Sequence, residues 1–500
     1  MNRFIPLRST ACVIALLSAS AASADVTAAE VWADWKENLA LYGEDGVSIE
    51  SETANGDTLT ISGITLTMND DITNVTASMG DIVLTEQGDG TVSVQMSESY
   101  PITVEAQEGG VVTMTIQQTG MELIVSGTAT DMKYDMSADK YALVIDQIEE
   151  DGKPIKADIR VIANDLVGTY TSKVGEMRDV TYDISAASLD MIADVTPPDT
   201  AGDYFTLSGK LDGIGTKATM TMPLAENIKD PADMFAQGFA MDGGYTYGSG
   251  SYIFDVKAEG EQTSGTVTTG PGTLDVAMSD KAISYDTLAN DLAIAMQGGS
   301  IPFPIEISMA QYGIGLDMPL GKTDEPADFG LRVNLSELAV NDMIWMLADP
   351  AGALPHDPVT LLVDLSGKAK LFFDLLDPEQ AEAIAMADVP GELNALTLNA
   401  LKLSAAGAEV TGVGDFTFDN TDLETFDGMP RPAGDVTVNI KGANALIDKL
   451  VKMGLIPEDQ AMMSRMMMGM FARTVGDDEL TSKIEINKEG HVIANGQRIQ

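Results

Sequence analysis

Apolar and polar residues alternate along most of the chain. In the range 47–192, Leu59 and Ile61 alternate with threonine and serine, and so do Val92 and Val94. A period of two residues predicts β-strands that bury one face and leave the other in water. Short segments rich in Gly, Asn and Asp separate these runs, and connections this short join antiparallel neighbours. The predicted fold class is therefore α+β, mostly antiparallel β: long meander sheets with one apolar face and a few covering helices.

Helical periodicity replaces this alternation near the N-terminus. Thr27 and Glu30 have the T-x-x-E spacing of a capping box. Val31, Trp35 and Leu39 then fall on one stripe of the predicted helix. We expect this helix to cover one end of the first sheet.

A helical hairpin is predicted at the C-terminus, over residues 444–474. Asn444 can cap its first helix, Gly454 ends that helix, and Pro457 opens the second one with acidic residues in the first turn. The hairpin would cover the apolar face of the neighbouring strands.

The proline-rich segment 194–203 has no apolar periodicity and is the best candidate for a linker. We therefore expect an N-terminal helix and β meander at residues 25–195, and a second β-rich domain at residues 203–500 that ends in the hairpin. A chain of this length usually forms two or three domains. The similar pentapeptides YDMSA at 134–138 and YDISA at 182–186 indicate duplicated hairpins rather than a strict repeat.

The first 24 residues have the order of a bacterial secretory signal peptide. Two arginines precede a short apolar run, and small residues end at Ala24, which predicts cleavage before Asp25. The apolar run is shorter than the roughly 20 residues of a membrane-spanning helix. We expect a periplasmic protein without a stable transmembrane anchor. Cys12 is the only cysteine and would leave with the signal, so the mature chain would have no disulfide.

Six methionines occupy nine positions in the segment AMMSRMMMGMF, residues 461–471. Helical spacing gathers most of them on one stripe, and we favour packing of this stripe in the core. A second interpretation is an apolar ligand wall, and a remote one is a copper(I) site built from thioether sulfurs. Too few basic residues flank the stripe for a typical membrane-surface helix. The candidate wall consists of Met463, Met466, Met467, Met470, Phe471, Leu446 and Leu450.

The chain is strongly acidic, with 77 acidic and 29 basic side chains and a formal net charge of −48. Such a surface repels phosphate backbones, which argues against nucleic-acid binding. The charge mainly favours solubility. No loop with the ligand spacing of a calcium site was found, which leaves only incidental calcium binding open.

Catalytic motifs are missing. His356 and His491 are the only histidines, and no G-x-S-x-G, P-loop or H-E-x-x-H sequence occurs. The many carboxylates make any chosen acid pair uninformative. We therefore expect no enzymatic activity, no cofactor and no resident metal.

These observations lead to a functional expectation. We expect a non-enzymatic periplasmic protein of cell-envelope maintenance that shields an apolar, lipid-like ligand, with a protein partner in the envelope as a further option. The alternative is a structural or interaction module with a fully packed core and no ligand. Copper(I) binding by the methionine helix is a remote alternative.

Three segments carry a resemblance to a known family. NDMIWMLADPAGALPHDPVTLLVDLSGKAKL at 341–371, ADVTAAEVWADWKE at 24–37 and LTSKIEINKEGHVIANGQ at 480–497 resemble an uncharacterised family of exported alphaproteobacterial proteins with a domain of unknown function. This resemblance implies a periplasmic location and supplies no catalytic residues. The expected meander with covering helices is also loosely similar to large envelope proteins that handle lipids, a likeness of architecture that does not establish function.

Overall fold

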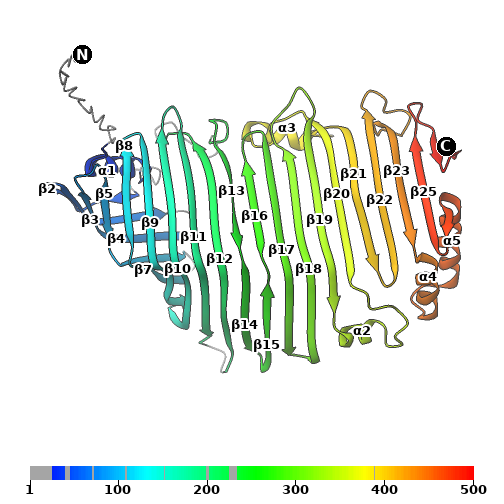
Figure 1. Cartoon of the computed structure of the whole chain (residues 1–500), viewed down its shortest axis with the longest axis horizontal. Coiled ribbons are helices and arrows are strands. Elements are labelled where there is room, and N and C mark those ends of the chain that lie inside the picture. Colours follow the sequence, from blue (N-terminus) through cyan, green and yellow to red (C-terminus); the bar gives the residue numbers. More distant parts are fainter. Residues whose placement is uncertain are drawn as a thin grey trace, which may run out of the picture.

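The strands in the described part of the chain form one antiparallel sheet, with 27 strands among these residues (Figure 1). This computed structural model confirms the predicted fold class. The predicted signal peptide and Ala24 lie outside the described residues and stay predictions. The structure describes residues 25–39, 46–69, 73–106, 110–150, 152–198, 202–224, 234–387 and 389–500.

The elements run along the sheet broadly in chain order, from its N-terminal end to its C-terminal end (Figure 1). The strands of the first half are β1 (Val47–Ser48), β2 (Ser51–Asn55), β3 (Thr58–Asn69), β4 (Thr73–Glu86), β5 (Val92–Met96), β6 (Ser99–Ala106), β7 (Gly110–Thr119), β8 (Glu122–Thr128), β9 (Asp131–Glu150), β10 (Lys153–Val174), β11 (Arg178–Thr196) and β12 (Tyr204–Met222). Those of the second half are β13 (Ala240–Tyr247), β14 (Ser249–Ala258), β15 (Glu261–Thr269), β16 (Gly272–Met278), β17 (Ala282–Gly298), β18 (Ile301–Pro319), β19 (Ala327–Val340), β20 (Val359–Leu371), β21 (Gly391–Ala405), β22 (Ala408–Asp419), β23 (Arg431–Lys441), β24 (Arg473–Gly476), β25 (Glu479–Ile486), β26 (Val492–Ala494) and β27 (Gln497–Arg498). The helices are α1 (Ala28–Leu39), α2 (Asp342–Ala348), α3 (Ala381–Met386), α4 (Ala443–Lys452) and α5 (Glu458–Phe471), and a 3-10 turn covers Pro378–Gln380.

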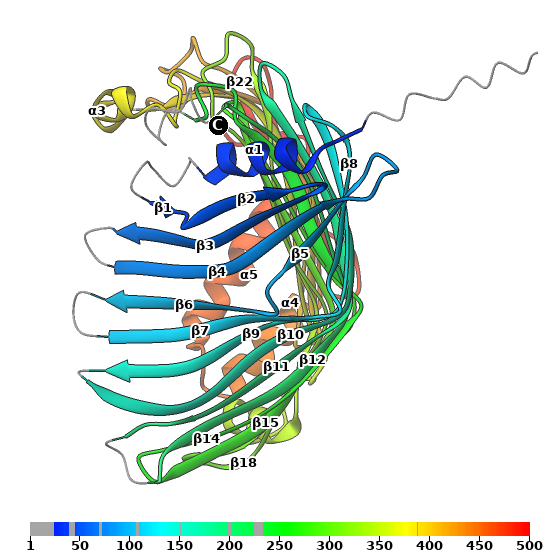
Figure 2. The ribbon, with the colours of Figure 1, turned by 90° about the vertical axis from the view of Figure 1, so that its left-hand side faces the viewer.

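The sheet is curved into a trough. Viewed along its long axis, the strands arch around a hollow side that is open to solvent (Figure 2). Helix α1 lies on the hollow side at the N-terminal end. Helices α4 and α5 lie on the same side at the C-terminal end (Figures 1 and 2). No helix of the described ranges therefore lies across the middle of the hollow side.

A closed hydrophobic core forms at the N-terminal end, between α1 and strands β3, β4, β5, β8 and β9. Val31 and Trp32 of α1 are 0% and 2% exposed, and Ile61, Ile82 and Leu84 below them are equally inaccessible. Burial of a large aliphatic side chain contributes about 1.5–3 kcal/mol. This end of the sheet therefore has the packing of an ordinary globular domain.

The capping box at the start of α1 is confirmed. The backbone N–H of Thr27 donates to Glu30 Oε2 over 2.9 Å, and the backbone N–H of Glu30 donates to Thr27 Oγ1 over 3.3 Å. A second carboxylate, that of Glu86 in β4, accepts from the Ala28 N–H over 3.0 Å. These bonds satisfy N–H groups that a helix leaves free and fix the start of α1 against the sheet.

The sheet continues across the segment that was predicted to be a linker. Strands β11 and β12 flank it and pair from Val195 with Phe205 to Arg178 with Met222. The segment is thus the connection of a long hairpin, and residues 199–201 within it lie outside the described ranges. The division of the chain into two domains at this point stays a prediction.

The C-terminal helical hairpin is confirmed, with one correction. Gly454 ends α4 in the left-handed conformation, with φ of +75°. Asn444 does not cap α4, because the helix already begins at Ala443. The cap comes from Asp478, whose carboxylate accepts from the backbone N–H groups of Asn444 and Ala445 over 3.1 and 2.9 Å. A cap 34 residues away in the chain leaves no local sequence signal.

Candidate functional site

Two rows of apolar residues follow the hollow side of the sheet from strand to strand. In each row, every residue is the direct cross-strand partner of the next. The upper row, in the upper half of the sheet in Figure 1, consists of Tyr134, Tyr170, Tyr182, Ala218, Gly243, Val276, Tyr285, Leu316, Leu331, Leu365, Leu398, Gly414, Val436, Ile484 and Ala494. The lower row consists of Tyr100, Ile116, Leu143, Val161, Met191, Gly209, Tyr252, Val267, Ile294, Ile307 and Val340.

The sequence echo belongs to the upper row. The repeated pentapeptides begin at Tyr134 and Tyr182, and both tyrosines are direct partners of Tyr170. The segment SYDTL at 284–288 is similar to these pentapeptides, and its Tyr285 lies in the same row on β17. The echo therefore marks equivalent positions, on different strands, along the same row.

A line of unusual backbone conformations separates the two rows, and we call it the crease. In β3, Gly63 has φ of +66°, and the apolar alternation shifts by one residue there. Ile61 and Leu66 lie before and after Gly63 and are an odd number of residues apart, so in a regular strand they would point to opposite faces. Both nevertheless belong to the core under α1. The shift therefore keeps the apolar residues of both halves on the same face. Positive φ values recur in later strands at Gly80, Asp165, Gly213, Asp291 and Glu337.

The later strands repeat the shift at the crease. In β17, Ile283 and Tyr285 are apolar before Asp291, and Leu292 and Ile294 are apolar after it. Side chains of a regular strand alternate between faces, so these pairs would otherwise point to opposite sides. The crease thus places the upper and lower rows together on the hollow side, which the contacts of Tyr134 with α1 identify.

The rows are open to solvent along most of their length. Leu316 and Leu331 in the upper row are 36% and 37% exposed, and Leu143 in the lower row is 37% exposed. An apolar sheet face normally packs against another layer of the protein. A contiguous exposed apolar surface of this kind marks a binding site for an apolar partner.

Aromatic rings lie over glycines on this face, so that the rings lie along the sheet and do not project into the trough. A Cβ atom at Gly209 would meet the Tyr252 ring at 2.0 Å, and one at Gly367 would meet the Phe329 ring at 2.5 Å. Each glycine is the cross-strand partner of the aromatic residue above it. The rings can lie along the sheet because the glycines have no side chain there.

The outer face of the sheet, opposite the rows, is polar. Arg332 bridges Asp286 and Asp317 on neighbouring strands, with N–O distances of 2.8 and 3.1 Å, and Lys217 pairs with Asp183 at 2.9 Å. A hollow of about 770 Å³ lies beside Lys217 and Asp183, and its mixed lining includes three threonines and three aspartates. The sheet therefore has one wet face and one apolar face.

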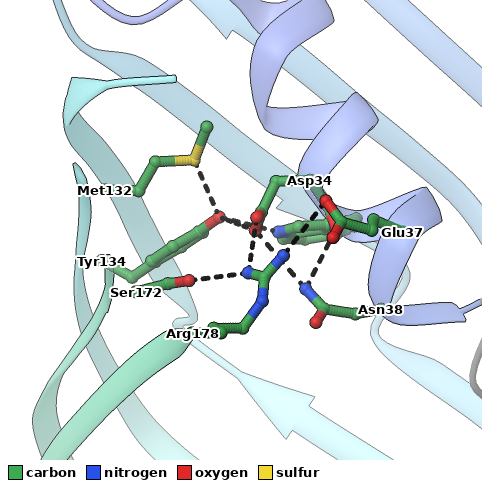
Figure 3. Close-up of polar contacts among 8 residues, drawn as sticks. Asp34, Glu37, Asn38, Met132, Tyr134, Ser172 and Arg178 are labelled. Atoms are coloured by element: carbon green, nitrogen blue, oxygen red, sulfur yellow. Dashed lines mark hydrogen bonds and ion pairs between the residues drawn. The ribbon is translucent and has the colours of Figure 1, made fainter. Parts of the chain in front are cut away.

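A buried ion pair fastens α1 to the sheet at the N-terminal end of the trough (Figure 3). Arg178 Nη1 lies 2.6 Å from Asp34 Oδ1 and donates to Ser172 Oγ over 2.7 Å. Its Nη2 forms an ion pair with Glu37 at 3.3 Å. Trp35 Nε1 donates to the Tyr134 hydroxyl over 3.1 Å. These polar contacts join α1 to β9, β10 and β11 and hold the helix over the start of the upper row.

The surroundings of this ion pair shift two pKa values. Burial raises the pKa of the Tyr134 hydroxyl, and the nearby Asp34 charge raises it further. Burial alone would lower the pKa of Arg178, but its hydrogen bond and charge interaction with Asp34 outweigh burial and raise it. Both groups keep one protonation state near neutral pH. The Arg178–Asp34 contact therefore fastens α1 to the sheet.

An apolar cleft of about 490 Å³ lies beneath α1, at the head of the trough. Its lining consists of Trp32, Trp35, Asn38, Leu39, Ile64, Met79 and Ile82. The Nε1 atom of Trp32 is buried and has no hydrogen-bond acceptor among the described residues. Mostly apolar clefts of this size with a few polar groups are typical ligand sites.

Five of the six methionines of α5 are exposed and Met468 is half-buried, so the prediction that the methionine stripe packs in the core is wrong. Met463 and Met466 are 56% and 57% exposed, whereas Ala461 is 2% exposed. The packed side of α5 is therefore the one opposite the stripe. The structure places Leu446, Leu450 and Phe471 half-buried and Met467 and Met470 exposed, and it does not test the ligand wall predicted from these residues.

The two histidines lie in different structural surroundings. The His356 ring stacks on Trp345 of α2, with 4.7 Å between ring centroids, and its Nδ1 lies 3.2 Å from Asp342. His491 lies in the turn before β26 and contacts Asn487. Among the described residues, no group of three His, Cys, Asp or Glu side chains could hold a metal ion. No helix in the described ranges has the length and apolarity needed to cross a bilayer.

Comparisons with known proteins add one finding. No curated protein and no solved structure matched the chain significantly. A family model does match the second half of the sheet, from within β14 through β26, and thus covers α2, the α4–α5 hairpin and the C-terminal end of both rows. Residues 254–493 of the chain match the family described as an uncharacterized protein conserved in bacteria (DUF2125), a domain of unknown function.

Proposed function

We propose that this protein is a non-enzymatic carrier of the bacterial cell envelope that shields the hydrocarbon chains of a lipid-like ligand in its trough. The observation that carries the proposal is the pair of continuous apolar rows, most of whose residues are partly exposed along the hollow side. The secretory signal predicted at residues 1–24 supports a periplasmic location for this carrier. There, a lipid between two membranes needs shelter from water.

The chemistry of the trough floor favours hydrocarbon over peptide. Each strand crossed by the rows, up to β25, pairs with neighbours on both sides, so its backbone N–H and C=O groups are already bonded. A peptide lying on this floor would leave its own backbone groups unsatisfied, at about 1–3 kcal/mol each. An acyl chain has no such groups.

The length of the trough favours a carrier along which lipid chains move, rather than a site that holds one lipid in place. Adjacent strands lie about 4.8 Å apart, so the upper row is roughly 65 Å long. The hydrocarbon core of a whole bilayer is only about 30 Å thick. A site for one stationary lipid needs no such length, whereas a carrier along which chains slide does.

The alternative, a structural module with a fully packed core, fits the structure less well. Its core would have to cover residues such as Leu316 and Leu331, which are more than one-third exposed. The closed packing at the α1 end supports this alternative for that end alone.

Charged residues in the trough test the proposal. We expect the full chain, purified without detergent, to carry lipid in native mass spectrometry and to bind a fluorescent fatty-acid analogue. Leu316→Asp and Leu331→Asp should weaken binding at least about tenfold, because an acyl chain cannot solvate the charge. Val167→Asp, the same kind of change at a 53% exposed residue of the outer face, is the matched control and should bind normally.

Two results would count against the carrier proposal. One is a wild-type protein that carries no lipid and does not bind the analogue. The other is an equal loss of binding in the Val167→Asp control. Circular dichroism of each variant checks that the sheet is intact.

A further inference from the structure

Helix α5 presents a methionine face to solvent. We define this face by Met462, Met463, Met466, Met467 and Met470, which are 68%, 56%, 57%, 53% and 60% exposed. The helix packs through its other side, where Ala461 is buried. Five large, flexible apolar side chains on one exposed helix face are the pattern of a helix that binds an apolar surface.

The charge of the hairpin distinguishes it from the rest of the chain. Residues 443–474 contain four basic residues and three acidic ones, a local charge of +1, whereas the whole chain has −48. Arg465 pairs with Asp448 at 2.5 Å within the hairpin. Lys452 and Arg473 are exposed beside it. The acidic repulsion that keeps the rest of the protein away from lipid headgroups is therefore weaker here.

The overall charge of −48 argues against a second copy of this chain as the partner that binds the methionine face. Two chains of −48 would bring their acidic sheets together around the contact. A bilayer surface requires only that the hairpin approach it. The few cations here, Lys452 and Arg473 among them, are fewer than a typical interfacial helix has, so the apolar methionine face itself would supply most of the attraction to the bilayer.

The methionine face has a fixed orientation at the C-terminal end of the trough. The carbonyl oxygen of Phe471, the last residue of α5, accepts from Ser482 Oγ over 2.6 Å and from Asn495 Nδ2 over 2.8 Å. Ser482 is the cross-strand partner of Val438 in the same sheet. A surface bound by α5 would therefore meet this end of the sheet.

We propose that the methionine face docks on the surface of a lipid bilayer and places the C-terminal end of the trough there. Docking goes beyond the carrier function and does not depend on it, because the face lies outside the two rows.

Co-flotation with phosphatidylcholine vesicles tests docking directly. The full chain should float with the vesicles. A variant with Met463→Gln, Met466→Gln, Met467→Gln and Met470→Gln should lose at least about nine-tenths of the floating fraction, because glutamine does not enter the acyl boundary. The matched control changes exposed apolar residues of α2 in the same way, at Met343, Met346 and Leu347, and should float like the wild type.

Three outcomes would overturn the docking proposal. The wild type stays at the bottom of the gradient, the α5 variant still floats, or the α2 variant loses as much as the α5 variant. A concentration-dependent dimer that the α5 changes abolish would assign the face to a second copy instead. Flotation involves no lipid loading, so intact flotation with an empty trough would reject only the carrier function.

Discussion

The ring of Tyr252 lies over Gly209, close enough that a Cβ atom at position 209 would meet its Cδ1 atom at 2.0 Å. Gly209→Ala should therefore lift the ring into the trough. We expect a loss of about 1–3 kcal/mol in the free energy of unfolding, the usual cost of overpacking. Urea unfolding measures it. Gly469→Ala is the control, because nothing lies within 4 Å of that position and alanine favours the helix.

A double-mutant cycle separates the clash from a general backbone effect. If the ring is the obstacle, Gly209→Ala should cost much less in a Tyr252→Ala background. Equal costs in both backgrounds would show that the ring does not cause the loss.

The alternation of single strands was predictable from the sequence, but the rows were not. The alternation around Leu59 and Ile61 is enough to predict a strand there. The row through Tyr170, Tyr182 and Tyr285 depends instead on the register of many strand pairs. The echo between Tyr134 and Tyr182 was the one local sign of that register. The crease also leaves a sign in the sequence, because the apolar positions switch between odd and even residue numbers within a strand. Only the pairing of the strands shows that this switch occurs at the same level in neighbouring strands.

Arg178→Met should destabilise the N-terminal end of the sheet. It leaves the buried carboxylate of Asp34 without its cation, and breaking one side of a buried ion pair costs about 3–5 kcal/mol. Unfolding by urea, followed through tryptophan fluorescence of α1, measures the loss. The exposed pair Arg160–Asp158 is the control, for which Arg160→Met should cost less than about 1 kcal/mol. A small effect of Arg178→Met would mean that α1 is held by its apolar face alone.

The methionine stripe shows a limit of helical periodicity. The spacing correctly gathered Met463, Met466 and Met470 on one face of α5. It could not show which face meets the protein, because that depends on where α4 and the sheet lie. The buried residue is Ala461, whose small side chain gives almost no hydrophobic signal. The ion pair of Asp34 with Arg178 was equally hidden, since 144 residues separate its partners.

Asp478 should make the hairpin sensitive to acid. Burial would raise the pKa of this carboxyl group, but the N–H donors of Ala445 and Asn444 outweigh it and lower the pKa below 3.8. A depressed carboxyl pKa contributes stability above the unfolded value that is lost as the pH falls through the folded value. Asp478→Asn, which keeps an acceptor oxygen but removes the negative charge from the start of α4, should therefore cost about 0.3–1 kcal/mol at neutral pH. The gap to the wild type should close below about pH 3.8, and a constant gap in urea unfolding at each pH would contradict this role.

The crease predicts an unusual preference at Glu337, whose φ is +56° inside strand β19. A β-branched residue, normally favoured in strands, should be the worst choice there, because a left-handed conformation costs L-residues about 1–2 kcal/mol. Glu337→Val should therefore unfold at lower urea concentration than Glu337→Gly, the reverse of the order expected for an ordinary strand. The control position is Arg332, which lies in the same strand with an ordinary backbone and should favour valine over glycine. If valine were the better residue at both positions, β19 would have no left-handed break, and Leu335 and Leu338 would not share the hollow face.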